Sequence, residues 1–230
     1  MKTSVSCIHT SPAAISPIAE FFAREAPGIQ ITNLLDDGLL RLLSRGDQAA
    51  VERRLSEMLC VAQEEYSAAA VLLTCSAIPA EILSRLRLQV PLPIVKVDEP
   101  MAEAAVRTGR RIGVVISFAA TCEPTERLLR KTAEAAGVEI EIVKRVVPAA
   151  YEALLTGRTD EHDRLLIDAV EQLAGEGAAC IVLAQVSMAR LLPKLAGRTK
   201  VPVLSSLSTC LQAIEQRLAI STSSPGKALP

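Results

Sequence analysis

The chain has 230 residues, which is enough for one large or two small domains with a full hydrophobic core. Half of the residues are hydrophobic but only 2% are aromatic, so the core is expected to be aliphatic. With 25 basic against 26 acidic residues the net charge is −1, so the chain lacks the basic excess and the aromatic surface that nucleic-acid binding needs. The apolar content also argues against wholesale disorder.

The cellular compartment is predicted from what the sequence lacks. Its most apolar runs, AAAVLL (68–73) and AACIVLA (178–184), are far shorter than the roughly 20 residues a membrane span needs. The first residues, MKTSVSCIHTSP, hold no continuous apolar segment, so no signal peptide is expected. Six scattered cysteines show no CxxC pair and no metal-ligand spacing. A cytoplasmic protein with free thiols and no metal site is the simplest interpretation.

The first half of the chain alternates short apolar runs with amphipathic stretches. Strands are predicted at 3–10, 28–35, 69–75 and 90–97. Helices are predicted from Ser16-Pro17 to about Glu25, from Asp47 to about Tyr66, and after Pro79. Asp36-Asp37 is expected to form a turn and cap. Helices between strands imply right-handed crossovers and a parallel sheet.

The same series then begins again. A helix over about 100–108 ends at Gly109, a strand covers 111–117, and a helix starts near Glu123-Pro124. A strand at 138–144, a helix over about 160–174, strands at 178–185 and 201–206, and a helix over 207–220 complete it. The polar tail 221–230 is expected to be mobile.

The two halves resemble each other at nearly constant spacing. The matching segments are 16–22 with 123–129, 70–76 with 180–186, and 92–97 with 201–206. We therefore predict an α/β fold of two similar, doubly wound lobes with parallel sheets, related by a pseudo-twofold. Lobe 1 is 1–97 plus 207–220, and lobe 2 is 98–206. Ligands of open parallel sheets bind beyond the carboxyl ends of the strands, so the site is expected in a cleft between the lobes.

Four predicted strand ends carry small polar residues. They are His9-Thr10-Ser11, Thr74-Cys75-Ser76, the segment 117–121 that ends at Thr121, and Gln185-Val186-Ser187. Helices begin soon after most of them, and helix starts favour anions. Many hydroxyls with little charge suggest a small carboxylate held by neutral donors.

Cys75 is the strongest candidate for a functional residue among them. It follows an apolar run and precedes a predicted helix, a position that favours a reactive thiolate. A strand cysteine is otherwise an ordinary small core residue. Thr74 and Ser76 on either side favour the functional interpretation here.

Four segments together resemble the aspartate/glutamate racemase superfamily: VLLTCSAIPAE (71–81), IVLAQVSMARLLP (181–193), KVDEPMAEAAVRTGRRIGVV (96–115) and ATCEPTERLL (120–129). The resemblance extends over about residues 3–215. That group includes aspartate, glutamate and hydantoin racemases, maleate isomerase and arylmalonate decarboxylase. The resemblance implies cofactor-independent chemistry next to a carboxylate, with one cysteine in each lobe flanking the substrate.

Cys75 matches the first family cysteine, but the repeat spacing puts Gln185 at the place of the second. An amide does not titrate usefully, so a two-thiol racemase is in question. Cys180 lies five residues earlier, at the start of its strand, and we expect it to be buried rather than to act as the partner thiol. Arylmalonate decarboxylase is a family precedent for one cysteine, although in the other lobe.

The remaining candidates have local alternatives. Thr10, Ser11, Ser76, Thr121 and Ser187 could hold the substrate or simply cap helices. His9 could donate to a ligand, and His162 could act as a general acid if its helix start faces the cleft. Cys7, Cys60 and Cys210 are interpreted as packing residues, and Cys122 as incidental.

These observations favour a cofactor-independent racemase or isomerase acting at the carbon alpha to a carboxylate of a small acid, with Cys75 as acid and base. No nucleotide motif appears, neither GxGxxG nor GxxxxGK(S/T). Two alternatives stay open: a one-sided proton transfer, as in decarboxylation or cis-trans isomerisation, and a non-catalytic carboxylate binder. A homodimer or higher homo-oligomer is possible, and no nucleic acid, membrane or metal is expected as partner.

Overall fold

The computed structural model describes residues 3–218, and the predicted mobile tail 221–230 lies outside them. The chain divides into two compact units. Within the described residues, the first unit consists of 3–95 and 211–218, and the second spans Lys96–Cys210. Each unit is built on one sheet of four strands. Among the described residues, no helix is both long and apolar enough to cross a membrane.

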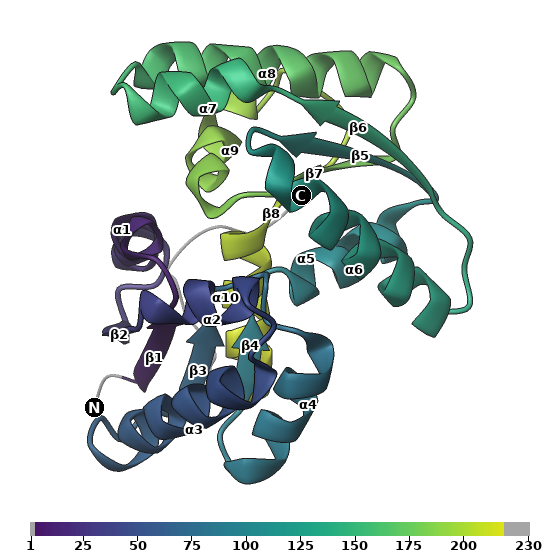
Figure 1. The fold of residues 1–230 in the computed structure, drawn as a ribbon. Coiled ribbons are helices and arrows are strands. Elements are labelled where there is room, and N and C mark those ends of the chain that lie inside the picture. The colour runs from purple at the N-terminus through teal and green to yellow at the C-terminus, as the bar shows by residue number, and fades with distance from the viewer. Residues whose placement is uncertain (1–2, 219–230) are drawn as a thin grey trace. The chain divides into compact units, whose positions relative to one another are not determined.

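The sheet of the first unit has the strand order β2-β1-β3-β4 (Figure 1). β1 pairs in parallel with both of its neighbours. The strands are β1 (Thr3–His9), β2 (Ile29–Leu35), β3 (Ala70–Leu73) and β4 (Ile94–Lys96). The helices are the 3-10 turn η1 (Pro12–Ala14), α1 (Ile15–Glu25), α2 (Gly38–Ser44), α3 (Gln48–Glu64) and α4 (Ala80–Gln89).

The core of this unit follows from side-chain periodicity. Every second residue along β3 and just beyond it points to the same face of the sheet. Val71, Leu73 and Cys75 therefore share one apolar cluster with Ile8. The same cluster takes the buried stripe of α3, which is Val51, Leu55, Leu59 and Ala62. The helix predicted from Asp47 to about Tyr66 is therefore confirmed, and Asp47 caps it by accepting a hydrogen bond from the Ala50 N–H.

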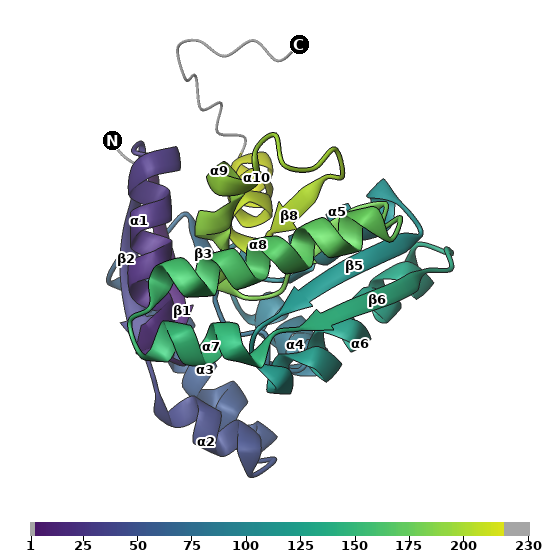
Figure 2. The same cartoon turned by 90° about the horizontal axis from the view of Figure 1, so that it is seen from above.

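The second unit repeats the topology with the strand order β6-β5-β7-β8. Its strands are β5 (Arg111–Ile116), β6 (Glu141–Val146), β7 (Cys180–Leu183) and β8 (Val203–Ser205). Its helices are α5 (Glu99–Thr108), η2 (Ala119–Thr121), α6 (Cys122–Ala135), α7 (Pro148–Leu155), α8 (Thr159–Gly175), η3 (Val186–Leu191), α9 (Leu192–Leu195) and, continuing into the first unit, α10 (Ser206–Leu218). α8 packs along β5 (Figure 2). The predicted α/β class with two similar parallel-sheet lobes is confirmed.

Three local predictions need correction. The helix predicted to begin at Ser16-Pro17 begins earlier, because the Ser11-Pro12 pair starts η1, which leads directly into α1 at Ile15. The strand predicted at 138–144 runs over Glu141–Val146, in register with β5. The short helices α2 and α7, at equivalent places after β2 and β6, were not predicted. Asp36 does form the predicted turn, since its carboxylate accepts the Gly38 N–H at 3.0 Å.

Candidate functional site

The carboxyl ends of two neighbouring strands in each sheet carry the predicted site residues. In the first sheet, His9 is the last residue of β1, and Cys75 follows the end of the adjacent β3 by two residues. In the second sheet, Ser117 follows β5 directly, and Gln185 follows β7 by two residues. Each sheet therefore brings two of the four predicted loops together at one edge. Cys75 and Gln185 occupy equivalent places in the two repeats.

Cys75 lies between the sheet edge and a helix start. It is 6% exposed and belongs to the apolar cluster on the α3 and α4 side of the sheet. The loop that follows leads to α4, which begins at Ala80 after Pro79. Its thiol is thus held in a largely water-excluded setting, close in sequence to the free N–H groups of a helix start.

The candidate hydroxyls divide into two groups. Within residues 3–218, the hydroxyls of Thr10, Ser76 and Ser187 make no hydrogen bond to the protein, which leaves them available for a ligand. Ser11 instead caps the start of η1, because its hydroxyl accepts the Ala13 N–H at 3.3 Å. The substrate-binding roles of these four residues stay predictions.

His9 is engaged on both ring nitrogens. Nδ1 lies 3.0 Å from the Thr74 hydroxyl oxygen, and Nε2 lies 2.9 Å from Asn33 Oδ1. The side chain is fully buried, and burial lowers the pKa of the imidazole, against the opposing effect of the Asn33 hydrogen bond. Both ring nitrogens of His9 face protein partners in this structure. Neither nitrogen is left to donate to a ligand, the role that the sequence analysis suggested.

Gln185 ties the ends of two strands together. Its Oε1 accepts the Ser117 N–H at 3.2 Å, and its Nε2 donates to the Thr121 hydroxyl at 2.9 Å. The Thr121 hydroxyl in turn donates to the Phe118 carbonyl at 2.7 Å, and Thr121 makes no side-chain cap bond to α6. The amide is therefore oriented by β5 and its following turn. The exposed Phe118 ring lies beside Tyr151 of α7, with centroids 4.9 Å apart.

His162 is placed away from these strand ends, within α8, and is fully buried. Its Nδ1 bonds to the neighbouring Asp163 carboxylate at 2.7 Å, while its Nε2 is buried without a hydrogen-bond partner in the described part of the chain. Asp163 also binds Arg190 and Lys194, each at 2.6 Å. This cluster joins α8 to η3 and α9, the segment that follows Gln185, and the sequence analysis missed its charged members.

The Asp163 cluster predicts an acid-sensitive contribution to stability. Burial raises the pKa of the Asp163 carboxyl, but hydrogen bonds from Lys194, His162 and Arg190 outweigh it and hold that pKa below its ordinary value. The contribution is therefore present at neutral pH and is lost as the pH falls through the folded-state pKa, below about pH 4. Asp163→Asn is expected to lower the free energy of unfolding by roughly 2 kcal/mol at pH 7, and by less at pH 3.

Urea denaturation at several pH values measures this effect. Asp168→Asn is the matched control, because Asp168 and its partner Arg164 form an exposed ion pair on the same helix. A difference between the Asp163 variant and the unmodified protein that stays constant from pH 7 to pH 3 would contradict the assignment.

The other cysteines take up packing positions, with one exception. Cys180 is fully buried in β7, where its thiol donates to the Ala105 carbonyl at 3.6 Å and burial raises its pKa to about 11, which confirms its predicted burial. Cys7 is buried with a pKa raised to about 12, and the Cys210 thiol donates to the Val97 carbonyl at 3.0 Å. The prediction for Cys60 is wrong, because it lies exposed on α3, off the buried stripe.

A buried ion pair was also missed by the sequence analysis. Lys96 and Asp98 are 6% and 7% exposed, and Lys96 Nζ lies 3.0 and 3.1 Å from the two carboxylate oxygens. Burial raises the pKa of Asp98, against the opposing effect of Lys96. The sequence held a signal for this buried lysine, since Lys96 stands between Val95 and Val97 in the predicted strand 90–97. Among the described residues no group of His, Cys, Asp and Glu forms a metal site.

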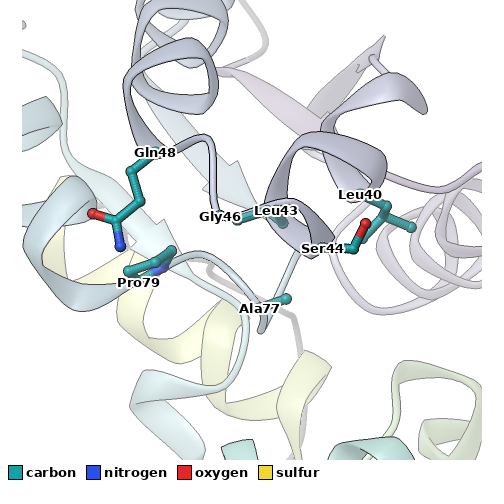
Figure 3. A pocket seen from close by; sticks show the side chains of 7 residues that line it. All are labelled: Leu40, Leu43, Ser44, Gly46, Gln48, Ala77 and Pro79. Carbon is teal, nitrogen blue, oxygen red and sulfur yellow. The ribbon is translucent and has the colours of Figure 1, made fainter.

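One pocket borders the loop that carries Cys75. It has a volume of about 370 Å³ and is lined by Leu40, Leu43, Ser44, Gly46, Gln48, Ala77 and Pro79. Figure 3 shows these side chains around the space that α2, the following turn and the loop after Cys75 enclose. The lining is mostly apolar and includes no charged side chain.

A comparison with sequence models of protein families shows to which family the chain belongs. The sequence model of the Asp/Glu/Hydantoin racemase family matches residues 22–214, which is most of the chain. The chain belongs to the Asp/Glu/Hydantoin racemase family. It is accordingly an enzyme of the racemase/isomerase superfamily. A comparison with curated protein sequences finds no match.

Solved structures agree on the fold of this racemase-family chain. An aspartate racemase homologue from Pyrococcus horikoshii OT3 is 14% identical, with 96% of this chain and 100% of that chain covered and a TM-score of 0.69. Allantoin racemase from Klebsiella pneumoniae is 20% identical, with coverages of 99% and 96% and a TM-score of 0.67. Unliganded arylmalonate decarboxylase is 20% identical, with 97% of each chain covered and a TM-score of 0.59.

Proposed function

We propose that this racemase-family enzyme moves a proton at the carbon alpha to the carboxylate of a small acid, without a cofactor, and that Cys75 is its acid and base. The observation that carries the proposal is the place of Cys75. It stands beyond the carboxyl end of an inner strand, in an apolar setting, ahead of the α4 start. This is the edge of a parallel sheet at which ligands bind.

The proposed reaction uses groups that the chain provides. The Cys75 thiolate takes the proton from the α-carbon, the C–H electron pair moves into an enediolate, and the thiol later returns a proton to that carbon. The unpartnered hydroxyls of Thr10 and Ser76, at the ends of adjacent strands, would donate to the carboxylate oxygens. Such donors stabilise the negative charge that develops on those oxygens.

A one-sided proton transfer is favoured over a two-thiol racemisation by the state of Gln185. Both functional atoms of this amide are already bonded, Oε1 to the Ser117 N–H and Nε2 to Thr121. An amide neither gives nor takes a proton readily, so it would orient the substrate or donate its second N–H to the enediolate. Decarboxylation and cis-trans isomerisation need only one proton at one face, and both stay within this proposal.

The uncharged pocket beside the Cys75 loop supports an acid whose substituent is uncharged. A volume of about 370 Å³ is adequate for a small substituent, and no cation in the lining could pair with a second carboxylate. Acids with an aliphatic substituent are therefore expected to be better substrates than aspartate and glutamate.

Deuterium uptake in heavy water tests the proposal. A panel of amino acids, hydroxy acids, ureido acids and malonates is incubated with the protein, and exchange at the α-carbon is followed by proton NMR. Uptake reports proton abstraction whether or not racemisation or decarboxylation follows. Exchange of at least one acid, with inhibition after iodoacetamide modification of Cys75, is expected. Saturable binding of these acids without exchange would instead indicate the non-catalytic carboxylate binder.

A further inference from the structure

A polar network, buried at His9 and Thr74 and exposed at Asn33, joins three strands beside Cys75. It runs from Asn33 on β2, through the His9 ring on β1, to the Thr74 hydroxyl just past β3. His9 is fully buried and Thr74 is 9% exposed. The last backbone hydrogen bond between β1 and the β3 segment is the Thr74 N–H to the Ile8 carbonyl, at 3.0 Å. The side-chain network therefore begins where the backbone ladder ends.

The hydrogen-bonding roles within the network are mutually constrained. Asn33 Oδ1 is an acceptor, so the His9 Nε2–H donates to it. In the neutral ring, Nδ1 then carries the lone pair and must accept from the Thr74 hydroxyl. The Thr74 hydroxyl oxygen lies 3.0 Å from His9 Nδ1 and 3.0 Å from the Ile8 carbonyl oxygen. The single hydroxyl proton is therefore shared between these two acceptors. The lowered pKa of His9 agrees with the neutral ring.

The side chains of Thr74 and Cys75 point to opposite faces of the sheet. Cys75 joins Leu73 and Ile8 in the apolar cluster on one face, while Thr74 meets His9 on the other. The network thus fixes the backbone at residue 74 from one face of the sheet, while the adjacent thiol lies on the other face. An apolar side chain could fill the place of His9 without burying polar atoms, so packing alone does not require this histidine.

We propose that His9 is a positioning residue, which holds the end of β3 through Thr74 and so gives the Cys75 thiol a defined position toward the α-carbon. This inference rests on the proposed function of Cys75. His9 does not touch the substrate, and its effect is exerted on the geometry of the thiol. Misplacement of a catalytic group by about 1 Å can reduce a rate by roughly 10²-fold.

Thr74→Val is the primary test, because it removes the hydroxyl and keeps the shape of the side chain. We expect kcat for α-proton exchange to fall roughly 10- to 100-fold while KM stays nearly constant. Thr74→Ser restores the hydroxyl and should restore kcat. His9→Leu should reproduce the effect of Thr74→Val. Thermal denaturation of each variant establishes that it is folded.

Ser6→Ala is the matched control. Ser6 is fully buried on β1 and bonds to the Thr32 hydroxyl of β2 at 2.7 Å, three residues before His9 and away from the strand end. It should lower the melting temperature without changing kcat. Equal kcat values for Thr74→Val and Ser6→Ala in an active protein would overturn the inference alone. Absence of exchange in the unmodified protein would overturn the proposed function and the inference with it.

Discussion

Replacing Cys75 with alanine is expected to lower the rate of α-proton exchange by about 10²–10⁴-fold, the usual contribution of a general base. Cys7 and Cys180, on inner strands of the two sheets, offer no substitute thiol. Cys180 and Cys7 are fully buried, with pKa values raised to about 11 and about 12, so neither forms a thiolate readily near neutral pH. The measurement is deuterium uptake by the best acid of the panel.

Cys60→Ser is the control for this variant. Cys60 is an exposed thiol on α3, so its loss should leave the exchange rate unchanged. Peptide mapping after brief iodoacetamide treatment then identifies which thiol a substrate-like acid protects. Exchange that persists at the original rate in Cys75→Ala would remove Cys75 from the mechanism.

Replacing Gln185 with cysteine is expected to add racemisation to the one-sided proton transfer proposed above. Gln185 follows β7 by two residues, as Cys75 follows β3, so the resemblance to the family implies a second cysteine at this place. A thiol can donate the proton that an amide cannot. We expect racemisation of the accepted acid to rise by at least about 10²-fold, with Cys75 still required. Loss of optical rotation, followed together with deuterium uptake, measures the gain.

Gln185→Ala separates the new thiol from the loss of the amide. Both variants break the bonds to the Ser117 N–H and the Thr121 hydroxyl, so both should be less stable than the unmodified protein. Only the cysteine variant should racemise. Rapid racemisation by the unmodified protein, or equal rates in the two variants, would contradict the one-sided mechanism.

Side-chain periodicity predicted much of each unit. The buried stripe of α3 and the apolar runs of β3 and β7 repeat at helical or strand spacing, which is a local property of the chain. Periodicity failed where elements are short. α2 and α7 have seven and eight residues, too few to establish a period. They are stabilised by packing against α3 and α8. Cys60 could have been predicted correctly, because it lies off the α3 stripe.

The sequence by itself determined that this is a parallel α/β protein of two similar halves, that Cys75 stands past a strand end, and that Gln185 is its counterpart. These conclusions need only local periodicity and the spacing between repeats. Only the tertiary structure decided what those residues touch. His9 meets Asn33 and Thr74, which are 24 and 65 residues away, and Gln185 meets Ser117 at a separation of 68. Such contacts arise because parallel strands distant in sequence become neighbours in a sheet, and no local pattern encodes which side chains then meet.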